Sequence, residues 1–402
     1  MSEPILIDVL VVGGGAAGLF ALHALRRAGA SVLLVENNSL GFGQTTSSQG
    51  ILHAGVKYSL GGLAGDDAKE AAEAAHQWIQ LLDGANADLR NVRVLTRQCY
   101  LWRTSTLRGA AGMLGAKLAL KTKPKAIASI DRPSWLDGVG GEVLTLGETV
   151  IDPRSLLREL STPHAHAMLK GNVTSITPRT SDVDVEIESS RRVRIRARHV
   201  ILTAGIGNQD MVGLSHTPNA SMQQRPLRQA MIRGALPLVF GHCIDGAKTR
   251  ITVTSDVFTA PDDVINAGHA SAANDVVWHV GGQIAEDGPR MGDKEFLEYA
   301  TGEICRCIPG VSLKECGFAS YDVTRAEPRT GDGKRPPTGF CRTQDRITTI
   351  WPVKLVLAPK IAAQLVKDME PSTHPQITLP MDLPRPELAP RPWETARWSA
   401  LV

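Results

Sequence analysis

In the first 36 residues of the chain, a glycine-rich segment separates two apolar runs, which is the pattern of a βαβ unit. An apolar run at Ile5–Val12 leads into the glycine-rich segment Gly13–Gly18, and a second apolar run at Ser31–Val35 ends in Glu36. In such a unit the glycines permit a tight turn and bring backbone amides close to a pyrophosphate, which faces the positive end of the helix dipole. An acid at the end of the second strand accepts hydrogen bonds from ribose hydroxyls. This spacing favours a dinucleotide site over an ordinary glycine-rich turn.

Each position of the turn has a separate expected role. Gly13 allows the tight turn out of the strand, Gly15 lets the backbone approach the pyrophosphate, and Gly18 allows close packing of the helix on the strand. The acid at the end of the second strand would repel a 2′-phosphate, which argues against an NADP-type ligand. The candidate residues at this end of the cofactor are Gly13, Gly15, Ala16, Ala17, Gly18, Glu36 and Asn37.

Length and composition exclude several classes of protein. The 402 residues suffice for two domains, since single hydrophobic cores stop growing near ~250–300 residues. The net charge is only +3 and no basic stretch is interleaved with aromatic residues, so nucleic acid is not an expected partner. The N-terminus enters a strand without a signal sequence, and no window is apolar enough for a transmembrane segment. We expect a cytoplasmic protein, and leave peripheral contact with a membrane open.

The cysteines give no sign of a disulfide framework or a metal centre. Six of them are spread along the chain without the paired spacing of metal ligands, which fits reduced thiols. Cys305 and Cys307 fall in a helix-like segment, where side chains two positions apart point to different faces. We therefore expect no metal site.

Downstream of Glu36 the pattern indicates a mixed α/β fold with two domains. Alternating strands at Val183–Glu188 and Arg191–Ala197 form a meander that leads into a buried strand at His199–Leu202. From Leu227 to Val280, β-rich runs between turn residues indicate an antiparallel sheet. Helices are expected at Asp66–Leu82, Leu107–Leu120, Asp293–Cys307 and Leu355–Met369. We expect a Rossmann-like domain with a central parallel sheet and β-meander (residues 1–95, 150–215 and 321–402) and a substrate domain with an antiparallel sheet (residues 96–149 and 216–320).

Three further segments bear on whether the dinucleotide contains nicotinamide or flavin. Residues 45–49 (Thr-Thr-Ser-Ser-Gln) offer the short polar side chains that the ribityl-phosphate chain of a flavin requires, although a surface loop would have the same composition. Thr203-Ala204-Gly205 follows a buried strand, where small residues let the backbone pass close to phosphates. The third segment is a turn-rich stretch, Arg325–Pro336, which precedes Trp351–Leu355 and the last helix.

Together these segments resemble the D-amino-acid oxidase-like superfamily of FAD-dependent oxidoreductases over nearly the whole chain. The stretch from Thr45 to Tyr58 is most similar to the glycerol-3-phosphate dehydrogenase and L-2-hydroxyglutarate dehydrogenase branch, which carries a similar Ser-x-Gly-hydrophobic-His-small-Gly sequence against the flavin ring. The resemblance implies FAD as the cofactor, with Gly50–His53 along the isoalloxazine and Val173 at the adenine. It adds these cofactor-binding residues: Thr45, Thr46, Ser47, Gln49, Gly50, Leu52, Val173, Thr203, Ala204, Gly205, Val353, Lys354 and Leu355.

One segment departs from the pattern of this superfamily. Many relatives have a Gly-His-Gly-like turn before the last helix, whereas this chain has Trp351-Pro352-Val353-Lys354. A close backbone contact with the pyrimidine edge of the flavin is therefore in doubt. Lys354 and the helix N-terminus could instead stabilise the negative charge of a reduced flavin, and a solvated lysine in the first helical turn is the alternative.

The candidate catalytic residues are His53, Lys354 and Arg325. His53 would remove the proton from a substrate hydroxyl or amine as hydride leaves the adjacent carbon, or would only hold the loop beside the cofactor. Arg325 favours an anionic substrate because arginine binds carboxylates and phosphates bidentately, although it could also pair with a structural acid. The candidate substrate-binding residues are Lys57, Tyr58 and Arg335. Three further histidines could face the ligand or serve a structural role: His242, His269 and His279.

The resemblance implies hydride transfer from a small substrate to flavin N5. We expect an anionic hydroxy acid or polyol phosphate as the substrate, and a quinone, an electron-transfer protein or oxygen as the electron acceptor. Two alternatives stay open, namely an amine or amino-acid oxidase that uses oxygen, and a flavin-binding scaffold without turnover. Anaerobic bleaching of the bound flavin by a substrate would exclude the scaffold.

Overall fold

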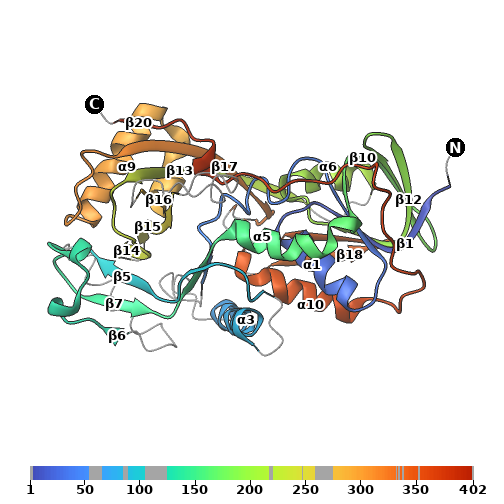
Figure 1. The fold of residues 1–402 in the computed structure, drawn as a ribbon, viewed down its shortest axis with the longest axis horizontal. Coiled ribbons are helices and arrows are strands. Elements are labelled where there is room, and N and C mark those ends of the chain that lie inside the picture. The colour runs from blue at the N-terminus through green and yellow to red at the C-terminus, as the bar shows by residue number, and fades with distance from the viewer. Residues whose placement is uncertain are drawn as a thin grey trace, which may run out of the picture.

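The computed structural model describes residues 3–53, 66–84, 89–104, 125–216, 221–246, 248–258, 275–331, 333, 336, 339–351 and 354–400. These residues form two lobes, each built on its own large sheet (Figure 1). A small third sheet consists of β3 (Ile51–Leu52), β8 (Thr149–Ile151) and β4 (Val94–Thr96). Among the described helices, none combines the length and the apolar composition that a membrane span requires.

The first sheet has eight strands, with the apolar strand β1 (Ile5–Val12) at its centre. β1 is parallel to β2 (Val32–Glu36) on one side and to β12 (Arg192–Leu202) on the other. The sheet continues in parallel through β9 beyond β2 and through β19 beside the second half of β12. The first half of β12 pairs antiparallel with β11, which gives the expected meander. The remaining strands are β9 (Met168–Lys170), β10 (Asn172–Pro178), β11 (Val183–Glu188), β18 (Phe340–Gln344) and β19 (Ile347–Trp351).

Four helices share one apolar core on one face of this sheet (Figure 1). They are α1 (Ala16–Arg27), α3 (Asp66–Asp83), α5 (Pro153–Ser161) and α10 (Ala358–Asp368). Leu19 and Leu22 of α1 are completely buried, and the indole N–H of Trp78 in α3 donates to the Val356 carbonyl at 3.0 Å. A shorter helix, α6 (Asn208–Leu214), packs beside β10. This packing fixes α1 with its N-terminus at the end of β1.

The second sheet has nine strands in the order β20-β17-β13-β16-β15-β14-β5-β7-β6 and is antiparallel except for the β14–β5 pair. Its strands are β5 (Cys99–Arg103), β6 (Lys125–Ala126), β7 (Val143–Leu146), β13 (Met222–Gly234), β14 (Gly241–Asp245), β15 (Lys248–Val257), β16 (Val276–Gly281), β17 (Gly317–Pro328) and β20 (Ser399–Ala400). The helices α8 (Gln283–Asp287) and α9 (Asp293–Cys307) belong to this lobe. Short 3-10 helices are η1 (Ser129–Asp131), η2 (Ser134–Leu136), η3 (Thr162–Ala167), η4 (Gly205–Gly207), η5 (Gly288–Arg290), η6 (Leu355–Leu357) and η7 (Pro392–Glu394).

The structure confirms the predicted fold class, and the differences concern where elements end. β11 and α9 have the predicted bounds. The two strands expected at 191–197 and 199–202 form one strand, β12, because its alternating half continues into its buried half without a turn. β17 extends to Pro328, so Arg325 lies in a strand rather than in a turn. The helix expected at 107–120 lies outside the described residues, and the domain boundaries remain a prediction.

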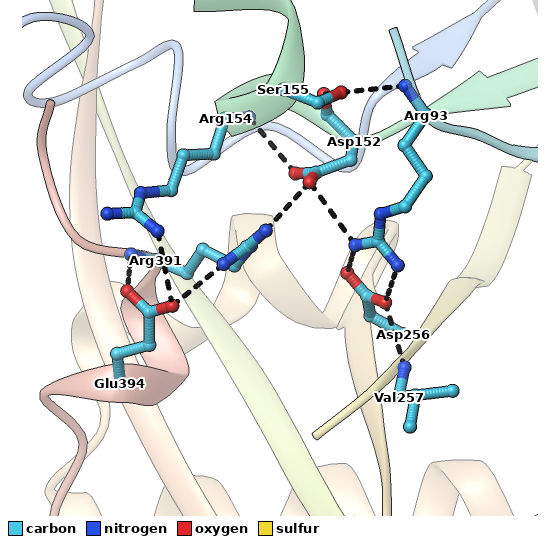
Figure 2. A network of polar contacts seen from close by, with 8 residues as sticks. All are labelled: Arg93, Asp152, Arg154, Ser155, Asp256, Val257, Arg391 and Glu394. Atoms are coloured by element: carbon cyan, nitrogen blue, oxygen red, sulfur yellow. Dashed lines mark hydrogen bonds and ion pairs between the residues drawn. The ribbon is translucent and has the colours of Figure 1, made fainter. Parts of the chain in front are cut away.

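A polar network joins the two lobes and the C-terminal tail (Figure 2). Asp152 caps α5 by accepting a hydrogen bond from the Arg154 backbone N–H at 3.0 Å. The same carboxylate pairs with Arg391 of the tail at 2.7 Å and with Arg93 at 3.2 Å. Arg93 also binds Asp256 at the end of β15, at 2.7 Å. We call Arg93, Asp152, Asp256 and Arg391 the interlobe clamp.

Candidate active site

A cavity of about 1250 Å³ lies between the carboxyl edge of the parallel strands and the second sheet. Its walls include the turns that follow β1, β2 and β12, which end at the same edge of the first sheet. Residues of β13, β15, β16 and β17 form the opposite wall. Ligands of open α/β sheets bind at this edge, and the volume exceeds the ~300–1,000 Å³ of ordinary small-molecule sites. The cavity therefore has room for a dinucleotide and a small substrate together.

The glycine-rich turn forms a bare backbone cradle at one end of the cavity. Gly13 has a φ of +107°, and a Cβ atom there would lie 2.6 Å from the Cα of Ala204. A Cβ atom on Gly18 would overlap the Gly13 carbonyl oxygen. At Gly15 the nearest described atom is the Thr45 Oγ1, at 3.3 Å. Gly13 and Gly18 are thus required by the fold itself, whereas a side chain on Gly15 would enter the space where a pyrophosphate fits.

The carboxylate of Glu36 borders the cavity in a fixed orientation. Its Oε2 accepts the Gly14 N–H at 2.7 Å, and its Oε1 accepts the Asn38 N–H at 2.8 Å. Each carboxylate oxygen can accept a second hydrogen bond, so ribose hydroxyls could still be bound there. Asn37 lines the same wall. The arrangement fits the sugar of a dinucleotide.

The hydroxyl-rich segment divides into residues that line the cavity and residues that hold the loop. Thr45 lines the cavity and its Oγ1 accepts the Ala16 N–H at 3.1 Å. Thr46 is buried outside the cavity lining and donates its hydroxyl to the Gly41 carbonyl within the loop, and its expected role at the cofactor stays a prediction. Leu52 is buried in the helix-covered core rather than at the cavity. Gly18 also stands outside the cavity lining.

The segment Thr203-Ala204-Gly205 packs directly against the glycine-rich turn. The Thr203 hydroxyl lies within 3.0 Å of the carbonyls of Val12 and Gly13, and the Ala204 N–H donates to Asn208 Oδ1 at 2.7 Å. The expected cofactor residues that line the cavity are Gly13, Gly15, Ala16, Ala17, Glu36, Asn37, Thr45, Ser47, Gln49, Gly50, Val173, Thr203, Ala204, Gly205, Lys354 and Leu355. Segments far apart in the sequence are thereby brought to one cavity.

The three candidate catalytic residues, His53, Arg325 and Lys354, all line the cavity. His53 follows β3 and its side chain is 19% exposed. Lys354 is only 7% exposed, which excludes the solvated lysine considered from the sequence. Four other expected site residues lie outside the described residues: Lys57, Tyr58, Arg335 and Val353.

Behind His53, a buried carboxylate is shared by two imidazoles. Glu148 lies in the turn between β7 and β8, its Oε1 is 3.3 Å from His53 Nδ1, and its Oε2 is 3.1 Å from His242 Nε2. Burial raises the pKa of the Glu148 carboxyl, but the charge of His53 and the hydrogen bonds from both imidazoles bring it well below its usual range. The ligating atoms of these three residues all lie within 4.8 Å of one another, as metal ligands can. The direct hydrogen bonds show that the carboxylate contacts the imidazoles themselves.

The sequence interpretation missed the polar wall supplied by the second sheet. Gln229 of β13 donates to the Ser47 carbonyl at 3.2 Å, while its buried Oε1 has no partner among the described residues. A Cβ atom on Gly281 would lie 2.9 Å from Gln49 Oε1 and 3.0 Å from Gln229 Oε1, so two amide oxygens converge there. The buried Ser48 hydroxyl, also on the cavity wall, likewise has no described partner. These polar atoms can receive a bound molecule.

Two other described histidines of the second lobe, His242 and His279, lie outside the cavity lining. His242 lies behind His53, and His279 is hydrogen-bonded through Nε2 to the Tyr321 hydroxyl. Burial lowers the pKa of His279 to about 3, so this ring is neutral at ordinary pH. His269 lies outside the described residues. Among the described histidines only His53 lines the cavity.

Sequence comparisons identify relatives along almost the entire chain. The family model described as FAD dependent oxidoreductase matches residues 8–340. A probable FAD-dependent oxidoreductase of Pseudomonas aeruginosa is 35% identical over 408 aligned residues, which cover 98% of this chain and all of the relative. A glycerol-3-phosphate dehydrogenase of Mycobacterium tuberculosis is 28% identical over 220 residues, which cover 50% of this chain and 42% of that protein.

Solved structures are likewise similar to this chain over almost its whole length. The crystal structure of the Pseudomonas aeruginosa oxidoreductase superposes with a TM-score of 0.77 at 32% identity, covering 98% of this chain and 99% of that one. An FAD-bound L-α-glycerophosphate oxidase of Mycoplasma pneumoniae gives 0.65 at 14% identity, covering 93% and 99%. A glycine oxidase of Geobacillus kaustophilus gives 0.63 at 15% identity, covering 92% and 97%. The last two similarities show a shared fold.

Proposed function

We propose that this chain, which belongs to the FAD dependent oxidoreductase family, oxidises a small anionic hydroxy acid or polyol phosphate. The observation that carries the proposal is the imidazole of His53 on the cavity wall, hydrogen-bonded at Nδ1 to the buried Glu148 carboxylate. FAD, when bound in the cavity, supplies the acceptor for a hydride. The electron acceptor that regenerates the cofactor stays open among a quinone, an electron-transfer protein and oxygen.

A histidine backed by a carboxylate suits the oxidation of an alcohol. A hydroxyl group must lose its proton as hydride leaves the same carbon, whereas a neutral amine already offers a nitrogen lone pair. His53 takes that hydroxyl proton at Nε2, and the C–OH group becomes C=O as the hydride departs. With Nδ1 directed to a carboxylate, Nε2 is the nitrogen that accepts.

Two cationic side chains support an anionic substrate. Arg325 and Lys354 both line the cavity, and Lys354 is buried there. Arg225 lines the cavity as well, and it pairs with Glu286 at 2.5 Å and with Glu327 at 2.9 Å. The similarity of half of the chain to a glycerol-3-phosphate dehydrogenase agrees with a phosphate or carboxylate group on the substrate.

The cofactor is assigned to the glycine-rich end of the cavity. Ala16 and Ala17 at the start of α1 would face the pyrophosphate, Glu36 the ribose, and Val173 the adenine. Gly50 would lie against the isoalloxazine, and Lys354 would stabilise the negative charge of the reduced ring. In this orientation the flavin would lie between the parallel sheet and the wall formed by β13, β15, β16 and β17.

A second candidate function is oxidation of an amino acid. The amide oxygens of Gln49 and Gln229 converge near Gly281 and could accept hydrogen bonds from an amine. The glycine oxidase among the structural neighbours agrees with this alternative. A carboxylate of either substrate type would be bound by the same cations, so the two candidates differ in the group that is oxidised.

Anaerobic mixing of the FAD-loaded protein with a substrate panel separates these candidates. The panel contains hydroxy acids, polyol phosphates and amino acids, and the measurement is the bleaching of flavin absorbance. We expect a hydroxy acid or polyol phosphate to reduce the flavin and amino acids to leave it oxidised. Bleaching by amino acids alone would establish the second candidate, and a flavin that no compound reduces would leave a binding scaffold.

A further inference from the structure

We propose that Glu148 is a positioning residue of this active site, whose carboxylate orients His53 and favours the proton that His53 receives from substrate. His242 is the second, buried partner that holds the carboxylate in place. The inference rests on the proposed role of His53 as a base.

The cluster is a chain of four side chains that leads from the cavity into the second sheet. His53 borders the cavity and Glu148 is 1% exposed behind it. His242 of β14 follows, and its Nδ1 lies 2.9 Å from Thr252 Oγ1 on β15. The rings of His53 and His242 are 5.6 Å apart and inclined by 34°. Three strands and a turn therefore fix the direction in which His53 presents its second nitrogen.

The local environment gives no stability reason for a carboxylate at this position. Glu148 lies between Leu146 and Val150, which belong to a buried apolar cluster. A buried ion pair or carboxylate is often no better for stability than a well-packed apolar side chain of similar volume. Buried acids with shifted titration are instead concentrated at functional sites. The placement of Glu148 directly behind a residue of the cavity wall fits that pattern.

The protonation of the two imidazole rings explains how Glu148 would orient His53. An ionised carboxylate only accepts hydrogen bonds, so His53 directs Nδ1–H and His242 directs Nε2–H toward it. This fixes the tautomer in which His53 Nε2 accepts. With both rings neutral the cluster carries one buried negative charge, and the proton taken up by His53 neutralises it. Proton uptake is therefore favoured at the moment when the substrate hydroxyl must lose its proton.

The titratable side chains that contact Glu148 are His53, His242 and Cys99. His53 reaches Glu148 from the segment after β3, and His242 reaches it from β14. Cys99 of β5 donates its thiol to the Glu148 carbonyl, and burial raises the pKa of that thiol well above its usual value. Cys99 is therefore uncharged at neutral pH. The attraction between His53 and Glu148 is thus the main charge interaction that the substitution below would remove.

The test compares Glu148→Gln with the parent by anaerobic stopped-flow reduction of the FAD-loaded protein over a range of pH, using the substrate found in the panel. We expect the limiting rate to fall about tenfold or more, within the ~10²–10⁴-fold contribution of a general base. The acid limb of the profile should move about one to two units toward lower pH, because an adjacent opposite charge is lost. Glu148→Asp should recover part of the rate, and Kd for substrate should stay close to the parent value.

Two controls separate positioning from a general loss of structure. Glu303→Gln removes a different buried carboxylate of the second lobe, paired with Arg250 away from the cavity, and should leave the rate and the pH profile unchanged. In a His53→Ala background, Glu148→Gln should have no further effect on the rate, since Glu148 acts through His53. An equal loss in both backgrounds, or an unmoved acid limb, would overturn the proposal.

A readout without substrate keeps the inference independent of the proposed reaction. In ¹⁵N-histidine NMR spectra, the signal that is absent in His53→Ala should report the Nδ1–H tautomer and should titrate at lower pH in Glu148→Gln. If no compound bleaches the flavin but this shift is seen, the proposed reaction is wrong, and the orienting effect of Glu148 on His53 is still supported. A stoichiometric divalent metal that is lost in Glu148→Gln would overturn the proposal in favour of a metal site.

Discussion

Two carboxylates four positions apart in the sequence, Glu148 and Asp152, are both buried but serve different partners. Asp152 is 2% exposed and accepts from the guanidinium groups of Arg93 and Arg391 in the interlobe clamp (Figure 2). Glu148 is 1% exposed and accepts from the imidazoles of His53 and His242. Arginine stays charged at any ordinary pH, whereas histidine gains and loses a proton near neutrality.

The position of each carboxylate matches the chemistry of its partners. The clamp joins the start of α5, the end of β15 and the C-terminal tail, and none of its four residues lines the cavity. The Glu148 cluster reaches the cavity wall through His53. Permanent charges thus connect the lobes, while titratable groups lie where the proposed reaction moves a proton.

The largest expected effect is on stability, from Asp152→Asn in the clamp. The asparagine can still cap α5 through its side-chain oxygen, but it lacks the negative charge with which Asp152 pairs with both Arg391 and Arg93. Removing one partner of a buried ion pair costs ~3–5 kcal/mol. We expect about 3 kcal/mol here, because Arg391 keeps Glu394 and Arg93 keeps Asp256. Urea unfolding followed by circular dichroism measures it.

The matched control for this variant is Asp382→Asn. Asp382 is 65% exposed and pairs with Arg191 at 3.4 Å on the surface. An exposed pair contributes ~0–1 kcal/mol, so the control should unfold almost like the parent. Burial raises the pKa of Asp152, but the hydrogen bond and charge of Arg391 and the charge of Arg93 bring it below its usual value. Its contribution is therefore complete above the unfolded pKa of ~3.9 and should not vary between pH 5 and about 8.

The second prediction concerns the buried imidazole of His164, which contacts the imidazole of the half-buried His23. His164 Nε2 lies 3.2 Å from His23 Nδ1 between η3 and α1, and burial followed by the charges of His23 and Arg26 lowers the pKa of His164 to about 4. The unfolded chain then binds the proton more tightly than the folded one. Stability should be full above pH ~6.5 and fall by about 3 kcal/mol as pH drops toward 4. Unfolding at a series of pH values measures this slope.

His164→Asn should remove most of that slope, because the titrating ring is gone. His216→Asn is the matched control, since His216 is exposed and has a φ of +52°, a conformation that asparagine tolerates. A slope that survives in His164→Asn would place the acid sensitivity elsewhere. The comparison with Glu148 is direct, because a carboxylate favours the protonated ring whereas burial alone opposes it.

The sequence predicted those parts of the site that depend on local geometry. The turn from Gly13 to Gly18 and the acid Glu36 follow rules of spacing within one βαβ unit, and both border the cavity or support its wall. The Thr203–Gly205 turn also lines the cavity, and the sequence indicates this turn through a short buried strand that ends in small residues. The conformation of each of these features is determined by a few neighbouring residues, so the sequence pattern is enough to predict it.

The parts that were missed depend on contacts between distant segments. Glu148 lies 95 positions from His53, and no periodic pattern in either segment of the sequence indicates the hydrogen bond between them. Gln229 reaches Ser47 over 182 positions. The burial of Lys354 is likewise set by tertiary packing, since the same residue on an isolated helix start would be solvated. No composition or spacing rule indicates such pairs.

The third prediction is that Glu148→Gln costs far less stability than Asp152→Asn. A glutamine amide can accept from one imidazole and donate to the other if one ring changes tautomer, whereas an arginine can never accept. We expect a loss of about 1 kcal/mol, the value of one ordinary hydrogen bond. Urea unfolding at neutral pH measures it beside Asp152→Asn. Equal losses in the two variants would remove the distinction between the clamp and the Glu148 cluster.

The smallest expected effect comes from Ser155→Ala, at the edge of the clamp. The Ser155 hydroxyl donates to the Asp152 carbonyl at 2.8 Å and accepts the Arg93 backbone N–H at 2.9 Å (Figure 2). Alanine loses both bonds but favours the helix more than serine, so we expect a net loss of about 0.5–1 kcal/mol. The double variant Ser155→Ala/Asp152→Asn tests whether the hydrogen bond from the Arg93 backbone to Ser155 helps to position the Arg93 guanidinium. Additive losses would mean that the two carboxylates position Arg93 by themselves, whereas a combined loss smaller than the sum would show that the clamp needs Ser155 to place Arg93.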